Sequence, residues 1–306
     1  MLSKKQTTST SPLVFFGTGN TSLEALQCLS EVFAIELIVT KPPALNSAGK
    51  HFKNSVHQWG EKNSIPIIAP ESQSELAKLI SSRVLKSKLG IVLDFGMIIP
   101  ARVIDAFGSG ILNSHFSLLP RHRGANPIRT AILRGDLKTG VTIIKITPGL
   151  DDGPILAWAE FDINNLNATI LREELSKLNC ALLPEAAKMY LNGQLDLINQ
   201  DQSEITHTTK TTKQNGRLDF NKTAEVLERE TRAYASWPKS YFDDNGQTYI
   251  VIDAKASAEV TPKGKLTAKN KCLYIGCELG SLQITSIQLA GKPAMEATSF
   301  INGYLK

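Results

Sequence analysis

The first 160 residues alternate short apolar runs with amphipathic segments, and this alternation constrains the fold more than any other feature. The first apolar run, Leu13 to Phe16, is followed by a glycine turn and a helical pattern capped by Thr21 or Ser22. Further apolar runs occupy 35–40, 65–69, 89–95, 110–116 and 141–147, and helical patterns occupy 54–64, 74–86 and 126–135. Strands that alternate with helices form a mostly parallel sheet covered on both faces. We therefore expect a Rossmann-like α/β domain over residues 12–200.

The last third of the chain has a different pattern. A long amphipathic helix is expected from about Ala168 to Asn192, and Pro184 should kink or split it. The following polar run has no hydrophobic period, so residues 201–213 are interpreted as a linker. One helical pattern and several short alternating strands then predict a smaller β-barrel of the five-stranded OB-like type over residues 214–306. The polar residues 1–11 are interpreted as a disordered tail.

Composition limits the class of protein. The chain is 42% hydrophobic and 21% charged, and no apolar run approaches the roughly 20 residues that cross a bilayer. The N-terminus lacks the apolar core of a signal peptide. The four cysteines are scattered and form no CxxC, so we expect buried thiols in a cytoplasmic protein, with neither a disulfide nor a metal site.

The net charge of +5 is unevenly placed. From His207 onward there are 14 lysine and arginine residues against 10 aspartate and glutamate residues, a balance of +4. A mildly basic C-terminal part is compatible with a polyanionic partner such as RNA, and a solvated lysine-rich surface explains the charge equally well.

The turn "GTGNTS" after the first strand contains Gly17 and Gly19, the start of a dinucleotide-binding pattern. The third glycine of that pattern is replaced by Ser22, and no acidic residue closes the second strand at the ribose-binding position. A nicotinamide cofactor is therefore not expected, and these glycines are interpreted as shaping a tight strand-to-helix turn.

The stretch "ILNSHF" places Asn113 and His115 two residues apart on a strand, so both side chains lie on one face. A lone histidine is usually a satisfied core residue, but Asp151 follows Asn113 by 38 residues, an interval that spans a helix and one further strand. Asp152 is the alternative carboxylate. An amide and an imidazole can stabilise an oxyanion while a carboxylate orients the imidazole or takes a proton. The trio favours acyl-type transfer to an amine, without a metal.

The string "NSHFSLLPRHRGANPIRTAILRGDLKTGVTIIKITPGLDDGPIL" resembles the signature of formyltransferases that use 10-formyltetrahydrofolate, and it is most similar to the methionyl-tRNA formyltransferase family. The stretches "FFGTG", "IVTKPP", "DFGMIIP", "LDFNKTAEVLERETRAYASWPKSYF" and "IQLAGKPAM" extend the resemblance over nearly the whole chain. The resemblance implies that Asn113, His115 and Asp151 are catalytic. It also implies that 10-formyltetrahydrofolate is the co-substrate and that methionyl-tRNA is the acceptor, in translation initiation.

The resemblance further implies two folate-contacting segments. One consists of Ser117, Leu118, Leu119 and Pro120, and the other, which lines the pterin, of Leu93, Asp94, Phe95, Gly96 and Met97. Where the family commonly has Ala-Tyr-Gly, this chain has Asp94-Phe95-Gly96, so a contact from a tyrosine hydroxyl is lost.

The loop after the second strand departs from the family as well. Arginines that grip the acceptor RNA are usual there, and this chain offers only Lys50, His51 and Lys53. Lysine attracts phosphate as a point charge but lacks the planar fork of arginine, so a differently arranged RNA contact is expected.

Together these observations predict a two-domain cytoplasmic enzyme, expected to be a monomer, whose C-terminal OB-like domain binds tRNA. Two alternatives remain open. The first is formyl transfer to a small amine, such as an amino sugar nucleotide or glycinamide ribonucleotide. The second is a non-catalytic RNA-binding protein that retains a transferase fold. Relatives that act on small amines tend to lack "GLDxG" or the C-terminal barrel, and this chain has the first and is predicted to have the second.

Overall fold

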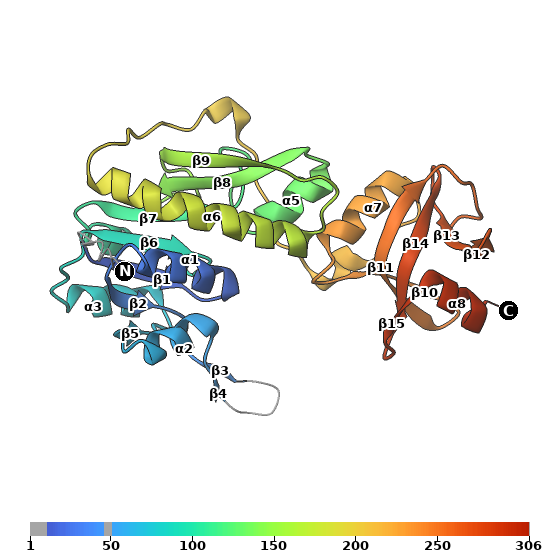
Figure 1. The fold of residues 1–306 in the computed structure, drawn as a ribbon, viewed down its shortest axis with the longest axis horizontal. Helices are drawn as coiled ribbons and strands as arrows, with labels where there is room; N and C mark the ends of the chain where they lie inside the picture. The colour runs from blue at the N-terminus through green and yellow to red at the C-terminus, as the bar shows by residue number, and fades with distance from the viewer. Residues whose placement is uncertain (1–10, 46–50, 306) are drawn as a thin grey trace, which may run out of the picture. The chain divides into compact units, whose positions relative to one another are not determined.

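The computed structural model describes residues 11–45 and 51–305, so the predicted tail lies almost entirely outside the described residues (Figure 1). The chain divides into two compact units. The first comprises the residues up to Gly124 together with 140–160 and 174–207. The second comprises 125–139, 161–173 and 208–306. Segments 125–139 and 161–173 therefore belong with the C-terminal part, because helix α5 (Pro127–Arg134) packs against helix α7 (Ala224–Ala233).

A seven-stranded sheet forms the centre of the first unit and has the order β5-β2-β1-β6-β7-β8-β9. The pairs from β5 to β7 are parallel, and β8 runs antiparallel to β7, so the predicted mostly parallel sheet is confirmed. The strands are β1 (Leu13–Gly17), β2 (Ile35–Val39), β5 (Ile67–Ile68), β6 (Leu89–Leu93), β7 (Gly110–His115), β8 (Lys138–Lys145) and β9 (Ile155–Asp162). A separate pair, β3 (Ala44–Leu45) and β4 (His51–Phe52), lies in the segment expected to be a loop.

Local signals account for the helix boundaries. The helices of this part are α1 (Asn20–Ser30), α2 (Ser55–Lys62), α3 (Gln73–Ser81), α4 (Ala101–Ile104) and α6 (Ala168–Leu191). Asn54 and Ser72 cap α2 and α3 by accepting hydrogen bonds from main-chain N–H groups at the third position. The predicted cap of α1 is wrong, because the helix begins at Asn20 and Gly19 is its N-cap. Ser22 instead donates its hydroxyl to the carbonyl of Leu93 at 2.6 Å and so fastens α1 to the end of β6.

The long helix α6 is continuous although Pro184 lies inside it, so the expected split does not occur. Buried residues on both sides of the proline, Leu183 before it and Ala187 after it, hold the helix by packing. On the sheet, alternate residues Val14 and Phe16 pack against the apolar face of α3 in one buried cluster.

A disulfide joins Cys28 of α1 to Cys180 of α6, with the Cα atoms 5.6 Å apart. The expectation of free thiols is therefore wrong for these two residues. Residues 152 apart in sequence give no sign that two helices bring them within bonding distance. Cys277 is a buried free thiol, as expected, and burial raises its pKa. The disulfide is unusual for the expected cytoplasmic location, because cytosolic proteins rarely keep disulfides.

The second unit contains an antiparallel sheet in which β10-β11-β14-β13-β12 form one path and β15 pairs with β14. Six strands therefore replace the five expected. They are β10 (Ser240–Asp244), β11 (Gln247–Ser257), β12 (Leu266–Lys269), β13 (Cys272–Gly276), β14 (Ser281–Leu289) and β15 (Ala294–Glu296). The core of the unit joins Leu227 of α7, Val251 and Ile284 of the sheet and Phe300 of α8 (Ala297–Tyr304). In the part of the chain that the structure describes, no helix has the length and apolar character of a membrane span.

Replacing Cys28 with serine should lower the free energy of unfolding by about 2–4 kcal/mol, because the bond restricts the unfolded chain over a loop of 152 residues. The control Cys272→Ser removes a free thiol and should change that free energy by less than about 1 kcal/mol. Urea denaturation without reductant measures both variants. Equal urea midpoints for Cys28→Ser and the wild type would show that the bond does not form.

Candidate functional site

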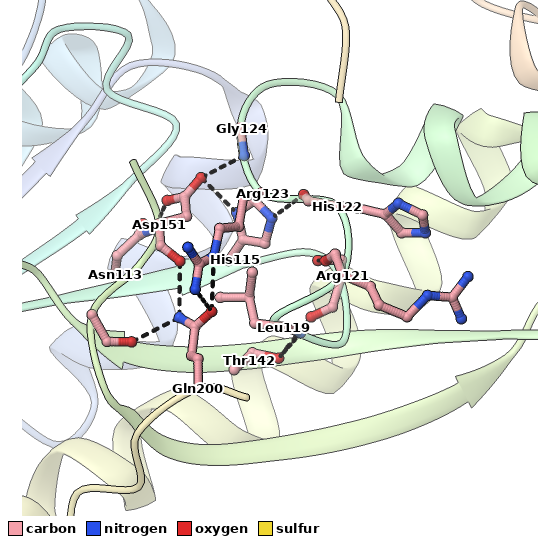
Figure 2. A network of polar contacts seen from close by, with 12 residues as sticks. Asn113, His115, Leu119, Arg121, His122, Arg123, Gly124, Thr142, Asp151 and Gln200 are labelled. Carbon is pink, nitrogen blue, oxygen red and sulfur yellow. Dashed lines mark hydrogen bonds and ion pairs between the residues drawn. The ribbon is translucent and has the colours of Figure 1, made fainter. Parts of the chain in front are cut away.

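Two of the predicted catalytic residues, Asn113 and His115, contact the carboxylate of the third, Asp151. Asn113 and His115 lie on β7, and Asp151 lies in the loop between β8 and β9. The Asn113 Nδ2 atom donates to Asp151 Oδ1 at 3.1 Å, and His115 Nδ1 lies 3.5 Å from Asp151 Oδ2 (Figure 2). The side chains of His115 and Asp151 are 7% and 17% exposed, so the three groups interact in a largely dehydrated environment.

The turn after β7 supplies the remaining contacts of this group. The main-chain N–H of Gly124 donates to Asp151 Oδ2 at 2.8 Å, so both carboxylate oxygens are engaged. His115 Nε2 lies 2.9 Å from the carbonyl oxygen of His122. A carbonyl only accepts, so Nε2 carries a proton and Nδ1 faces the carboxylate.

The loop 146–154 brings Asp151 to β7 by a route that the sequence did not indicate. Because β8 is antiparallel to β7, its last residue Lys145 pairs with Leu112, and Asp151 is not at the end of a parallel strand. The loop closes tightly, with Lys145 N–H donating to the Pro154 carbonyl at 2.9 Å. A Cβ on Gly153 would lie 1.8 Å from the Lys145 carbonyl oxygen, so only glycine fits there.

Asp152, the alternative carboxylate, points elsewhere. It is exposed and accepts a hydrogen bond from the hydroxyl of Thr147 within the same loop. The geometry therefore favours Asp151 as the partner of the imidazole, and Asp152 serves as a natural control.

The proposed pterin segment follows β6, next to β7. Leu93 and Phe95 are buried, whereas Asp94 and Gly96 are exposed and adopt positive φ values of 49° and 69°. Thr18 donates to the Phe95 carbonyl at 3.3 Å. Backbone groups and the Asp94 side chain, rather than the side chains of Leu93 and Phe95, are thus available to a ligand at this segment.

The second proposed folate segment, Ser117 to Pro120, is fixed by two hydrogen bonds to Thr142 on β8. The Thr142 hydroxyl donates to the Ser117 carbonyl at 2.7 Å and accepts from Leu119 N–H at 3.2 Å. Ser117 and Leu119 are buried, while Leu118 and Pro120 are partly exposed.

In the loop after β2, where an RNA contact was expected, Lys53 pairs with Glu61 at 2.6 Å, whereas Lys50 and the His51 side chain lie outside the described residues.

The loops that carry the trio are also contacted by Arg123, Gln200 and Thr206, which were not among the predicted site residues. Arg123 lies inside the quoted signature, and only its motif context could have drawn attention to it. Gln200 and Thr206 lie in or beside the polar run interpreted as a linker. Among the described residues, no group of three or more His, Cys, Asp or Glu side chains could hold a metal ion.

The amide of Asn113, the imidazole of His115 and the carboxylate of Asp151 lie together beside a strand of a mostly parallel α/β sheet, an arrangement compatible with group transfer. Comparison with known proteins makes the class specific. A family model described as formyl transferase matches residues 13–187, and one described as formyl transferase, C-terminal domain, matches residues 210–305. The chain belongs to the formyl transferase family and is an enzyme.

Two relatives and one solved structure illustrate the match. A methionyl-tRNA formyltransferase of Novosphingobium aromaticivorans is 32% identical over 293 residues, covering 95% of this chain and 96% of that protein. Another of that name, from Chloroflexus aggregans, is 32% identical over 301 residues with the same coverage. The crystal structure of an N-formyltransferase from Helicobacter canadensis, with folinic acid and dTDP-3-aminofucose, has a TM-score of 0.69 at 19% identity. That match covers 90% of this chain and 98% of the other.

If the trio is catalytic as expected, Asn113→Ala, His115→Ala and Asp151→Ala should each lower the turnover number for formyl transfer by about a hundredfold or more, the usual cost of losing a group that stabilises a transition state. The control Asp152→Ala should leave the turnover number within about threefold of the wild type, since its side chain faces solvent. Steady-state kinetics of purified variants measure both effects. A large loss for Asp152→Ala with near-normal turnover for Asp151→Ala would reverse the assignment.

Proposed function

We propose that the enzyme transfers the formyl group of 10-formyltetrahydrofolate to the α-amino group of methionyl-tRNA. The observation that carries the proposal is that Asn113 and His115 both contact the carboxylate of Asp151 in a chain of this family. Relatives named methionyl-tRNA formyltransferase, similar over 95% of the chain, support the acceptor. The C-terminal family domain over residues 210–305 supports it too.

Asn113 is the direct donor to the reacting oxygen in this proposal. The amine attacks the formyl carbon, a C–N bond forms, and the formyl oxygen becomes an oxyanion. The Asn113 amide has two N–H groups, and one donates to Asp151, so the other remains for the oxyanion. Both ring nitrogens of His115 face protein oxygens, one on His122 and one on Asp151, so in this proposal His115 supports Asp151 rather than donating to the oxyanion.

Asp151 takes up the proton of the attacking amine in this proposal. The attacking amine becomes positively charged and must lose a proton as the bond between the formyl carbon and N10 of the folate breaks. The carboxylate of Asp151, with lone pairs beyond those used by Asn113 and Gly124, accepts that proton. Nitrogen N10 leaves and takes up a proton, so that tetrahydrofolate and the formylated amine are the products.

The segments beside the trio fit a folate co-substrate. The solved relative from Helicobacter canadensis contains folinic acid, a formylated folate. In this chain, Asp94 and Gly96 are exposed just after β6, the strand that pairs with the strand of Asn113 and His115, and Leu118 offers a partly exposed apolar surface. The carboxylate of Asp94 can accept hydrogen bonds from the amino group and ring N–H of a pterin.

The acceptor is the point that an experiment must decide. The full chain is incubated with 10-formyltetrahydrofolate and either methionyl-tRNA, free methionine or a dTDP-linked amino sugar, and formylated products are quantified. We expect kcat/KM for methionyl-tRNA to exceed that for the other amines by about a hundredfold or more, because the tRNA offers many backbone phosphates, whereas the sugar nucleotide has a single diphosphate and methionine has none. Preferential formylation of the amino sugar would replace the proposal with the small-amine alternative, and no product with any acceptor would remove it.

Binding of tRNA should depend on salt. Phosphate contacts release counterions, so raising KCl from about 50 to about 200 mM should increase KM for methionyl-tRNA at least tenfold. The KM for the small folate should change by less than about threefold over that range. Initial rates at matched pH measure the two constants. Equal salt dependence of both constants would show that the lysines and arginines of the C-terminal part do not hold the tRNA.

A further inference from the structure

The segment 198–207 follows helix α6 and connects two loops of the site. At one end, Ile198 and Ile155 exchange two main-chain hydrogen bonds of 2.9 and 2.8 Å, which places the segment beside the loop that carries Asp151. At the other end, Thr206 accepts main-chain hydrogen bonds from the turn after β7. Its hydroxyl accepts from His122 N–H, and its carbonyl accepts from Arg123 N–H, both at 2.9 Å.

Gln200 lies between these ends and bonds to both loops (Figure 2). Its Nε2 donates to the carbonyls of Asp151 at 2.9 Å and Gly153 at 2.7 Å. Its Oε1 accepts from the Arg123 guanidinium, from Nε at 3.0 Å and from Nη2 at 2.7 Å. A single side-chain amide therefore fastens the loop of Asp151 to the turn that presents the His122 carbonyl and Gly124 N–H.

We propose that Gln200, supported by Arg123, is a positioning residue that fixes the carboxylate of Asp151 for formyl transfer, and this inference rests on the proposed function. Gln200 does not touch the reacting groups; it acts through the main chain of Asp151. Arg123 is only 6% exposed, so its buried cation requires the acceptor that Gln200 provides.

Chemistry explains why an amide is suited to this place. The two loops present opposite needs, since the carbonyls of Asp151 and Gly153 need a donor and the Arg123 guanidinium needs an acceptor. Glutamine has both functions on one rigid planar group. Glutamate would keep the contact to Arg123 but lose the donor, so Gln200→Glu separates the two functions of the side chain.

The kinetic arm of the test uses the full chain with 10-formyltetrahydrofolate and methionyl-tRNA. Gln200→Ala and Gln200→Glu should each lower kcat about tenfold to a hundredfold, because small displacements of catalytic groups are costly, while both KM values stay within about threefold. Asn199→Ala, the exposed neighbour, should stay within about twofold of wild type in every constant. Normal kcat for Gln200→Glu would overturn the proposal, because the donor would then be unnecessary.

A double-mutant cycle separates positioning from a general structural role. When Asp151→Ala already removes the carboxylate, adding Gln200→Ala should change kcat by less than about twofold, because its effect passes through Asp151. If the loss caused by Gln200→Ala is repeated in full in the Asp151→Ala background, Gln200 acts by another route and the inference is wrong.

A second arm does not depend on the acceptor. Hydrogen exchange measured by mass spectrometry on peptides spanning residues 120–126 reports the N–H of Gly124, which donates to Asp151. In Gln200→Ala this exchange should be about tenfold faster than in wild type, whereas Asn199→Ala should not change it. Unchanged exchange in Gln200→Ala and Gln200→Glu would overturn the inference even if the enzyme formylates tRNA. A wild type without transferase activity would remove the proposed function while the exchange still decides the contact.

Discussion

The carboxylate of Asp151 is the interaction on which the arrangement of the site depends. It binds a side chain of β7 through Asn113 and a turn through the N–H of Gly124, and it faces the ring of His115. A partly buried carboxylate must be held by donors, because its charge is costly away from water. Placing it therefore requires the loop 146–154, the turn after β7 and the strand itself to be in register. The hydrogen bonds of the segment 198–207 help to keep these parts in register, because Gln200 binds the loop of Asp151 and Thr206 binds the turn after β7.

Much of the fold and the centre of the site followed from local sequence rules. Period-two placement of Asn113 and His115, and the apolar runs that became β1, β2, β6 and β7, are properties of short windows, in which side-chain direction and burial are fixed by the strand. The expectation of Asp151, with Asp152 as the alternative, agrees with the contacts of the two carboxylates. The parallel part of the sheet follows from strands that alternate with helices.

The features that were missed depend on contacts between distant segments. The antiparallel direction of β8, the Cys28–Cys180 bond and the place of Gln200 each join residues far apart in the chain, and no periodicity carries that information. The polar run around Gln200 has no apolar stripe because the segment is fixed by hydrogen bonds rather than by burial of apolar side chains. Hydrophobic patterning detects only the second kind of order, so a structured polar segment is indistinguishable from a linker.

The proposed recognition of a polyanion and the proposed chemistry of transfer would depend on different interactions in this chain. In the second unit, several lysines already bind carboxylates, namely Lys222 with Glu230, Lys263 with Glu278, Lys265 with Asp244 and Lys269 with Glu259. The Lys222–Glu230 pair has a largely buried carboxylate, but more exposed pairs such as Lys263–Glu278 contribute only about 0–1 kcal/mol, so phosphates can compete for their lysines at low salt. The bonds around Asp151 are largely buried and are screened far less by ions. Salt should therefore act on the binding of an RNA before it acts on the geometry of the reacting groups.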